Sequence, residues 1–463
     1  MTHRIRGRRL GGAAMALATT AMAAAALAAA VLGGQLSPAR AADGPAPVIF
    51  VHGDSDTAGL WMVQAWRFES NGFPRDRLYA VDLDHPSARS DDDVAQPNRS
   101  STTDVAAGLA AETARALIRT GADSAAFVGN SRGCQTIRNF VQNGGGRHVA
   151  DVMVLAGCVH HGVFDFPTAA LGSEYNGSGR FLTALNAGPE VPEGVKAVTI
   201  RSDRFDLYAQ PTGEWIGMAG VPLNVGHDGA ALEGADNRVL PGADHRETGY
   251  SPEAFAIMYE AITGMAPATT AVTPEAAPQL DGKVSGWANG RPTNRPLEGA
   301  KVTVYPTDPA TGERQGIAVH TRTVGPDGRW GPFIADPEQT YEFVVEAEGY
   351  PTQHIYRSPF PRSFDQVSLR LYPYEGAAAE PGAAAAIGMM RPRGYFGAQQ
   401  DRVMLDGAAA PGLPDTEVPG VWKSFKTFDG PEPRSVTGSF GEETIAGRAW
   451  PTDGHVAWIE LTY

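Results

Sequence analysis

The sequence predicts an α/β fold with a mostly parallel sheet, followed by all-β sandwich domains towards the C-terminus. Two observations lead to this prediction. Between Pro47 and Gly264, short apolar runs alternate with longer segments of helical period, as in strand–helix units around a parallel sheet. Beyond residue 280, short runs of alternating polarity are separated by Gly, Pro, Asn and Asp turns, which is typical of a β-sandwich.

The chain has 463 residues, more than one compact domain usually contains. Its composition changes abruptly at APATTAVTPEAAPQ, which has no periodicity and is typical of a linker, and again at EGAAAEPGAAAAIG. The predicted organisation is an export signal over 1–41, an α/β domain over 42–266, a linker over 267–280, a β-sandwich over 281–374, a linker over 375–389 and a small β domain over 390–463.

The first 41 residues have the composition of an export signal. Arginines precede a long Ala-rich apolar run, which ends in an A-x-A cleavage pattern at 39–41. The pair Arg8-Arg9 and the weakly apolar run resemble a twin-arginine signal. A membrane anchor is the alternative, because the run over 13–32 is nearly long enough to span a bilayer. The small side chains favour removal, so we expect a secreted or periplasmic bacterial protein with no stable membrane anchor.

The remaining chain is acidic. Removing residues 1–41 takes away five arginines and no acids, so the formal net charge falls from −14 to −19. Such a surface repels the phosphates of nucleic acids and anionic lipids. We therefore expect no nucleic-acid partner.

Six apolar runs are expected to form the strands of the parallel sheet. They are PVIFVHG, LYAVDL, SAAFVGNS, DVMVLAGC, VKAVTIRS and NRVLPG. The segment TDVAAGLAAETARALIRT has apolar residues at near-helical spacing behind the capping candidates Thr103 and Asp104, so it predicts a helix. A last helix is expected over PEAFAIMYEAITG, where Pro252 suits a first helical turn and Gly264 a C-cap.

A serine follows the third of these strands, in AAFVGNSRGCQTIRNF. Gly129-Asn130-Ser131-Arg132-Gly133 is a G-x-S-x-G motif between a strand and a helix, the context of a nucleophile elbow. So sharp a turn strains the serine backbone and leaves no room for side chains at the two glycines. The hydroxyl is lifted above the carboxyl edge of the sheet, beside the N–H groups of a helix start. Ser131 is the candidate nucleophile, and a structural turn serine is the alternative.

The order of motifs points to a known family. The first strand leads into HGD at 52–54, and a histidine follows the sixth strand in VLPGADHRE. With Ser131 between them, residues 47–264 resemble an α/β-hydrolase, most closely the secreted bacterial class 2 lipases and esterases. The resemblance implies an oxyanion hole made of the backbone N–H groups of Asp54 and Arg132. It also implies a serine esterase without metal or organic cofactor.

The sequence departs from this group at two positions beside the nucleophile. Asn130 stands where the group commonly has His, and Arg132 stands in place of an apolar residue. The side chain of Asp54 is also unusual, because a carboxylate beside an oxyanion is unfavourable unless it points away or is hydrogen bonded. These departures leave the chemistry intact and the substrate open.

His245 is the candidate base. It lies between the last strand and the last helix, which places its imidazole over the same sheet edge as the serine. Among the other histidines, His52 is expected to brace its loop, His160 and His161 to be structural or pocket-lining, and His227 to belong to a turn.

The acid is expected directly after VKAVTI, in RSDRFDLYAQP, where two aspartates qualify. Asp206 is preferred because it precedes Leu207-Tyr208 in the manner of the acid loops of this fold. Asp203 is the alternative. The acid holds the imidazole tautomer and stabilises the imidazolium.

The two cysteines of the chain, Cys134 and Cys158, are expected near the carboxyl edge of the sheet on neighbouring elements. An oxidising destination would permit a disulfide between them. Two buried free thiols are the alternative, and a metal site is disfavoured because no C-x-x-C or paired His spacing is present.

The β region resembles a second family. From Gly282 to Tyr350 the pattern G-x-V, GAxVxVY, DGxWG and YxFxVxAxGY is similar to that of carboxypeptidase-regulatory-like, transthyretin-related domains. The resemblance implies a β-sandwich of about 100 residues.

The sequence as a whole predicts a secreted serine hydrolase that cleaves carboxylic esters, lipid and polymeric esters included, through an acyl-enzyme. The alternatives are a polyester depolymerase or amidase, and a non-catalytic surface-binding protein with a vestigial hydrolase fold. Acyl length, alcohol preference, the ligand of the β domains, a lid over 164–186 and the oligomeric state are not indicated.

Overall fold

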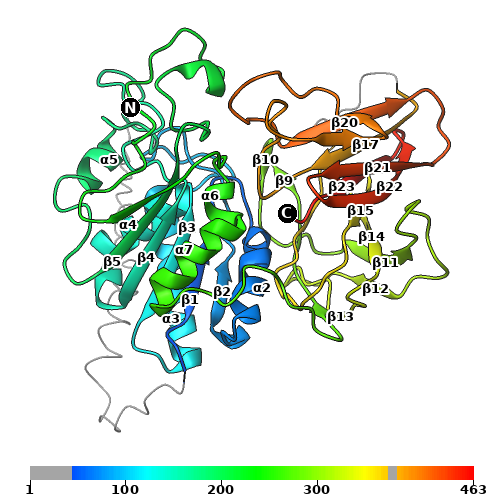
Figure 1. Cartoon of the computed structure of the whole chain (residues 1–463), viewed down its shortest axis with the longest axis horizontal. Coiled ribbons are helices and arrows are strands. Elements are labelled where there is room, and N and C mark those ends of the chain that lie inside the picture. The colour runs from blue at the N-terminus through cyan, green and yellow to red at the C-terminus, as the bar shows by residue number, and fades with distance from the viewer. Residues whose placement is uncertain (1–43, 374–382) are drawn as a thin grey trace, which may run out of the picture. The chain divides into compact units, whose positions relative to one another are not determined.

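A computed structural model describes residues 44–373 and 383–463 (Figure 1), and residues 44–463 form one compact unit. The predicted export signal and residues 375–382 of the predicted second linker lie outside the described residues. Within the described ranges, none of the helices combines the length and the apolar character needed to cross a membrane.

The α/β part is built on six parallel strands, which confirms the predicted sheet (Figure 1). Their order across the sheet is β2-β1-β3-β4-β5-β6, and every neighbouring pair is parallel. The strands are β1 (Val48–Val51), β2 (Leu78–Val81), β3 (Ala125–Asn130), β4 (Ala150–Ala156), β5 (Lys196–Ser202) and β6 (Asp236–Leu240). With helices on both faces, this sheet has the α/β-hydrolase fold.

Helices cover both faces because each strand alternates its side chains between them. Val48 and Phe50 of β1 pack in one core with α2 and α7, whereas Ile49 and Val51 pack in another with α3 and α4. The α-helices are α2 (Met62–Ser70), α3 (Thr102–Thr120), α4 (Arg132–Asn143), α5 (Arg180–Leu185), α6 (Glu247–Tyr250) and α7 (Pro252–Thr263). Short 3₁₀ turns span Ala58–Trp61, Arg75–Arg77, Gly146–His148 and Gly213–Ile216.

The two helices predicted from periodicity are present, as is the helix expected after the serine, and one helix start differs. α3 is capped by Ser101, not by the predicted Thr103 or Asp104. Ser101 Oγ accepts a hydrogen bond from the Asp104 N–H, and the Asp104 carboxylate accepts one from the Ser101 N–H. This is a capping box, in which Asp104 is the third helical residue. α7 ends at Gly264 in the left-handed conformation, as predicted.

The C-terminal half is all β, and most of its strands belong to one sheet (Figure 1). Eleven strands are joined in the order β12-β11-β14-β15-β23-β17-β22-β21-β18-β19, with β20 paired to β17. The strands are β7 (Gln279–Leu280), β8 (Val284–Ser285), β9 (Trp287–Ala288), β10 (Arg291–Pro292), β11 (Lys301–Thr307), β12 (His320–Thr323), β13 (Phe333–Ile334), β14 (Thr340–Glu346), β15 (Thr352–Arg357), β16 (Leu369–Arg370), β17 (Ala385–Met390), β18 (Val403–Leu405), β19 (Ala408–Ala409), β20 (Lys423–Phe428), β21 (Arg434–Phe440), β22 (Glu443–Pro451) and β23 (His455–Glu460).

The two predicted β segments are joined edge to edge within this sheet. β15 pairs in parallel with β23, from Thr352 opposite His455 to Arg357 opposite Glu460. The sequence did not predict β15, and β17 begins at Ala385, inside the segment 375–389 predicted as a linker. The backbone ladder therefore makes one continuous β layer from both segments.

The β half shares a core with helix α2 of the α/β half. Met62 and Trp66 of α2 belong to the same buried cluster as Trp330 and Phe360 of the β half. The Trp66 indole N–H also donates to the Ser363 carbonyl, with 3.0 Å between nitrogen and oxygen. Burial of two such side chains contributes several kcal/mol, so the β half is packed on the α/β half and not merely tethered to it.

Candidate active site

Ser131 lies at the turn between β3 and α4 with a strained backbone. Its φ is +55° and its ψ −124°, a combination that costs a non-glycine residue about 1–3 kcal/mol. A Cβ at Gly133 would overlap the Val51 carbonyl oxygen, and one at Gly129 would lie 2.9 Å from the Gly133 carbonyl carbon. Both glycines are therefore required, as expected of a nucleophile elbow.

His245 and Asp206 are hydrogen bonded to each other. His245 Nδ1 lies 2.9 Å from each carboxylate oxygen of Asp206, and both side chains are buried. Asp206 follows β5 and His245 follows β6, so the carboxyl ends of neighbouring strands bring them together. Asp203, the alternative acid, accepts hydrogen bonds from the N–H groups of Arg204 and Gly242 instead, at 2.7 and 3.2 Å.

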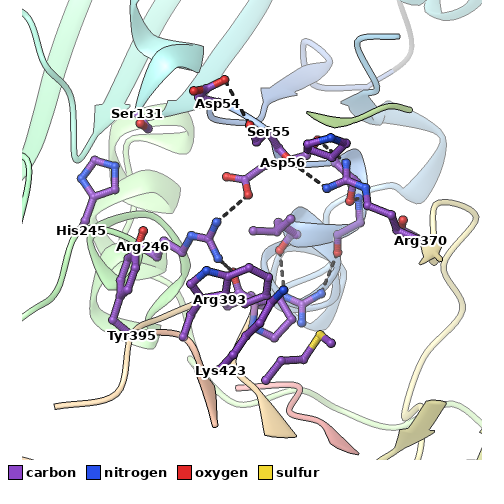
Figure 2. A pocket seen from close by; sticks show the side chains of 18 of the residues that line it. Asp54, Ser55, Asp56, Ser131, His245, Arg246, Arg370, Arg393, Tyr395 and Lys423 are labelled. Carbon is purple, nitrogen blue, oxygen red and sulfur yellow. Dashed lines mark hydrogen bonds and ion pairs between the residues drawn. The ribbon is translucent and has the colours of Figure 1, made fainter. Parts of the chain in front are cut away.

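Ser131 and His245 line the same cavity, and Figure 2 shows both side chains at one end of it. Asn130 connects their two loops, since its Nδ2 donates to the carbonyls of Ala156 at 3.0 Å and His245 at 3.3 Å. The ring of Tyr208 meets the imidazole edge to face, with 4.6 Å between centroids. Because Nδ1 is held by the carboxylate, Nε2 is the imidazole nitrogen left to exchange a proton with a reacting group.

The predicted oxyanion donors come from two loops above the sheet. Arg132 is the first residue of α4, so its N–H has no partner within the helix. Asp54 follows β1 and lines the cavity. Its carboxylate accepts hydrogen bonds from the Ala88 N–H at 3.0 Å and from Ser55 Oγ at 3.4 Å. The carboxylate is therefore hydrogen bonded, which is the condition for tolerating it beside an oxyanion.

The Arg132 side chain has a structural role. Its guanidinium makes a two-pronged ion pair with Glu174, at 2.6 and 2.8 Å, and also donates to Ser100 Oγ and to the carbonyls of Ser100 and Pro86. Burial alone would lower the pKa of Arg132, but the facing carboxylate outweighs it and the pKa is raised. The pair fastens the segment around Glu174 to the serine elbow, and that segment lies within the range considered as a lid.

A disulfide joins Cys134 in the first turn of α4 to Cys158 after β4, with 5.9 Å between the Cα atoms. Both residues are buried. The crosslink holds the helix that begins at the serine elbow to the end of the neighbouring strand, so the elbow is anchored from behind.

The other four histidines weighed in the sequence analysis either hydrogen bond to neighbouring loops or are buried. His52 Nε2 accepts from the Leu83 N–H at 3.2 Å, as expected of a loop brace. His161 bonds Gly229 and Glu190, and His227 bonds Ala209. His160 is fully buried, and both its ring nitrogens are without a hydrogen-bond partner. Burial therefore lowers the pKa of His160 far below its usual value.

The loop of His245 is tied to the β half by a network that the sequence did not predict. Asp244 accepts hydrogen bonds from the Tyr395 N–H at 2.6 Å and from Arg391 Nη1 at 3.2 Å. Burial, together with the neighbouring Glu247 carboxylate, raises the pKa of Asp244 to about 7. The β half thus positions the loop that carries the candidate base.

The cavity has a volume of about 490 Å³ and is lined by both halves of the chain (Figure 2). From the α/β half come Ser131 and His245, and from the β half come Arg370, Arg393, Tyr395, Trp422 and Lys423 among others. Sequence reasoning missed the second group. These residues are scattered over more than 50 positions and have no motif, so only the folded chain brings them together.

Within residues 44–373 and 383–463, no group of three or more His, Cys, Asp and Glu side chains is placed to hold a metal ion. The expectation of a cofactor-free enzyme stays a prediction.

A family comparison matches residues 278–373 to the lipase C-terminal domain. This match covers the first part of the β half. A comparison with curated protein sequences finds no match.

Solved structures similar to this chain include lipase B of Aspergillus fumigatus, at 17% identity and a TM-score of 0.34, over 49% of this chain and 54% of that one. The chain thus spans about half the length of that lipase. A Bacillus licheniformis lipase in its propeptide form matches at 15% identity and a TM-score of 0.35, over 88% of this chain and 92% of its own. A phospholipase from Legionella pneumophila matches at 13% and 0.32, over 71% and 94%. The chain has an α/β-hydrolase fold joined to a β half whose first part, residues 278–373, matches the lipase C-terminal domain.

Proposed function

We propose that this protein is a serine hydrolase that cleaves carboxylic esters through an acyl-enzyme, with Ser131 as nucleophile, His245 as base and Asp206 as the acid. The observation that carries the proposal is that Ser131, with its strained backbone, lines the same cavity as His245, whose Nδ1 is hydrogen bonded to the buried Asp206. A serine with a purely structural role rarely has such a strained backbone. In a nucleophile elbow the same strain raises the hydroxyl above the edge of the sheet.

In the first half-reaction, Ser131 Oγ attacks the ester carbonyl while His245 Nε2 takes the hydroxyl proton. Asp206 accepts a hydrogen bond from Nδ1–H throughout and stabilises the imidazolium. The oxyanion accepts hydrogen bonds from the N–H groups of Arg132 and Asp54. Removing one such donor typically costs about 3 kcal/mol of transition-state stabilisation.

The tetrahedral intermediate then collapses to the acyl-enzyme, and His245 returns the proton to the departing alcohol. In the second half-reaction, water attacks the acyl carbonyl as His245 takes its proton. Collapse of this second intermediate releases the acid and restores the Ser131 hydroxyl.

The cavity favours an ester of small-molecule size. Its volume of about 490 Å³ is within the range of small-molecule sites, and residues of the β half line it together with Ser131. The lipase C-terminal domain match supports the lipase-like assignment.

The finer expectations from the sequence belong to the same proposal. We infer export by the signal over 1–41, action outside the cytoplasm and no nucleic-acid partner, because the chain beyond the signal is acidic. The domain limits and the transthyretin-related assignment of the first β segment rest on sequence pattern alone.

The test is hydrolysis of p-nitrophenyl esters by Ser131→Ala protein. The matched control is Ser90→Ala, which changes an exposed serine. We expect Ser131→Ala to lose turnover by several orders of magnitude with an unchanged circular dichroism spectrum, and Ser90→Ala to behave as wild type. Undiminished turnover by folded Ser131→Ala overturns the proposal. Faster cleavage of a matched p-nitroanilide than of the ester identifies an amidase instead.

A further inference from the structure

The wall of the cavity contributed by the β half is cationic. The cavity lining has six basic side chains, namely Arg246, Arg291, Arg357, Arg370, Arg393 and Lys423, against the three acidic side chains Asp54, Asp56 and Glu460. This excess stands out in a chain whose formal net charge is −14. A cationic recess in an acidic protein concentrates anions locally, because field lines are focused by its low-dielectric walls.

The acids of the lining do not neutralise this excess. Asp56 is paired with Arg246 at 2.6 Å, and Glu460 with Arg357 at 2.8 Å. The carboxylate of Asp54 is held by the Ala88 N–H. All three acids are therefore committed to groups of the protein itself.

The guanidinium groups of Arg370 and Arg393 donate hydrogen bonds to backbone carbonyls and not to carboxylates. Arg370 donates to the Ser55 and Asp56 carbonyls at 2.6 and 3.0 Å, and its buried Nε has no partner. Arg393 donates to the carbonyls of Gly59 and Leu60 at 2.7 and 2.9 Å. Neither forms an ion pair among the described residues. Burial lowers the pKa of Arg393 to about 10, so its guanidinium stays charged at neutral pH. Burial also lowers the pKa of Arg370, and a guanidinium loses its proton only with great difficulty.

Lys423 lines the same wall, and its ammonium nitrogen lies near three aromatic rings. The nitrogen is 4.1 Å from the ring centroids of Tyr372 and Trp422 and 5.3 Å from that of Trp458. Figure 2 shows its charged end directed into the cavity. No hydrogen bond or ion pair from this ammonium to the described residues is present. Cation–π contacts leave its N–H donors unused, so an anion could take them.

We propose that the β wall binds an anionic group of the substrate, so that the enzyme acts on esters that carry a second, negatively charged group. Lys423 donates a hydrogen bond directly to that group. Arg370 and Arg393 attract it through their positive charge without direct contact. The inference rests on the proposed function and adds the substrate class. The β half is then part of the substrate site and decides which esters are accepted.

The experiment compares, at pH 6, esters that are closely matched in size and differ in charge. One pair places the charge on the acyl side, with the p-nitrophenyl monoester of glutarate and its methyl-capped neutral twin. A second pair places it on the alcohol side, with the butyrate esters of 4-hydroxybenzoate and of 4-hydroxybenzamide. We expect kcat/KM for the anionic member of at least one pair to exceed that of its neutral twin about tenfold, the value of one charge-assisted hydrogen bond.

Variants assign that preference to Lys423. Lys423→Met is expected to bring the anionic-to-neutral ratio close to one, and Lys423→Arg to retain most of the preference. Lys426→Met is the matched control, because Lys426 lies on the same strand, pairs with Asp406 and does not line the cavity. Equal kcat/KM within both wild-type pairs, or an unchanged ratio in Lys423→Met, overturns the inference.

Direct binding separates this inference from the proposed function. Glutarate is titrated calorimetrically into Ser131→Ala protein with and without Lys423→Met. If wild-type protein hydrolyses no ester, the proposed function fails, and the titration alone decides on the anion site. Binding that is lost with Lys423→Met supports the site, and absence of binding overturns it.

Discussion

The charged side chains on the two sides of the cavity differ in whether they are paired within the protein. On the α/β side, every charged group near Ser131 has a partner in the protein, as in Arg132 with Glu174 and His245 with Asp206. On the β side, Arg357 is paired with Glu460, but Arg370, Arg393 and Lys423 form no ion pair among the described residues. Groups that do chemistry must be held in place in advance, whereas groups that recognise a ligand must keep capacity for it.

The largest change in kcat is expected from substitution of the acid, Asp206. Asp206→Asn should lower kcat about ten-thousandfold, because an amide does not hold the imidazole in the required tautomer. Asp203→Asn is the matched control and should stay within about twofold, since Asp203 bonds backbone N–H groups outside the cavity. Steady-state kinetics with p-nitrophenyl butyrate measure both. The reverse order of effects would move the acid to Asp203.

A second prediction concerns the pair beside the elbow. Arg132→Met should destabilise the protein by about 3–5 kcal/mol in urea unfolding, because Glu174 is left buried without its ion-pair partner. The double variant Arg132→Met, Glu174→Leu should recover most of that loss, since no charge remains buried. A loss below about 1 kcal/mol for the single variant would mean that the α/β side does not depend on its internal pairing.

The third prediction is a pH dependence of substrate preference. Burial, with the positive charges of Arg370 and Arg246, lowers the pKa of Lys423 to about 7. Lys423 is thus cationic below pH 7 and neutral above it, so the preference for anionic esters should fall as pH rises from 6 to 8. Measuring kcat/KM for a charged ester and its neutral twin at each pH cancels the titration of the triad. A flat ratio in wild type, or the same slope in Lys423→Met, would contradict this assignment.

The smallest effect is expected far from the cavity. Ser101→Ala removes the cap of α3 and should cost about 1 kcal/mol in urea unfolding, while kcat/KM stays unchanged. The exposed Ser90→Ala variant should change neither quantity. A loss of activity with Ser101→Ala would show that the site depends on the stability of α3, which the geometry does not suggest.

The sequence predicted the α/β half well because its signals are local. The apolar runs became strands in parallel order, and the G-x-S-x-G motif lies at a strained turn since Gly129 and Gly133 permit nothing larger. The placement of Asp206 beside His245 follows from neighbouring strands that end at the same edge. Periodicity and turn chemistry suffice for such features.

The cavity residues of the β half could not be predicted from the sequence, and the reason is physical. Arg370 belongs to β16, Arg393 follows β17 and Lys423 begins β20. They lie in two β segments that are joined by the pairing of β15 with β23. That pairing depends on long-range register, which leaves no local pattern. Helix α2, which packs the β half onto the α/β half, was likewise not predicted.

The central claim is that the Ser131 hydroxyl is an activated nucleophile. The most direct measurement is labelling of folded wild-type protein with a fluorophosphonate, followed by mass spectrometry of the proteolytic peptides. The account predicts one adduct, on the peptide that contains Ser131, and its loss after His245→Ala. Folded protein that takes up no label, or label on another serine, would contradict it.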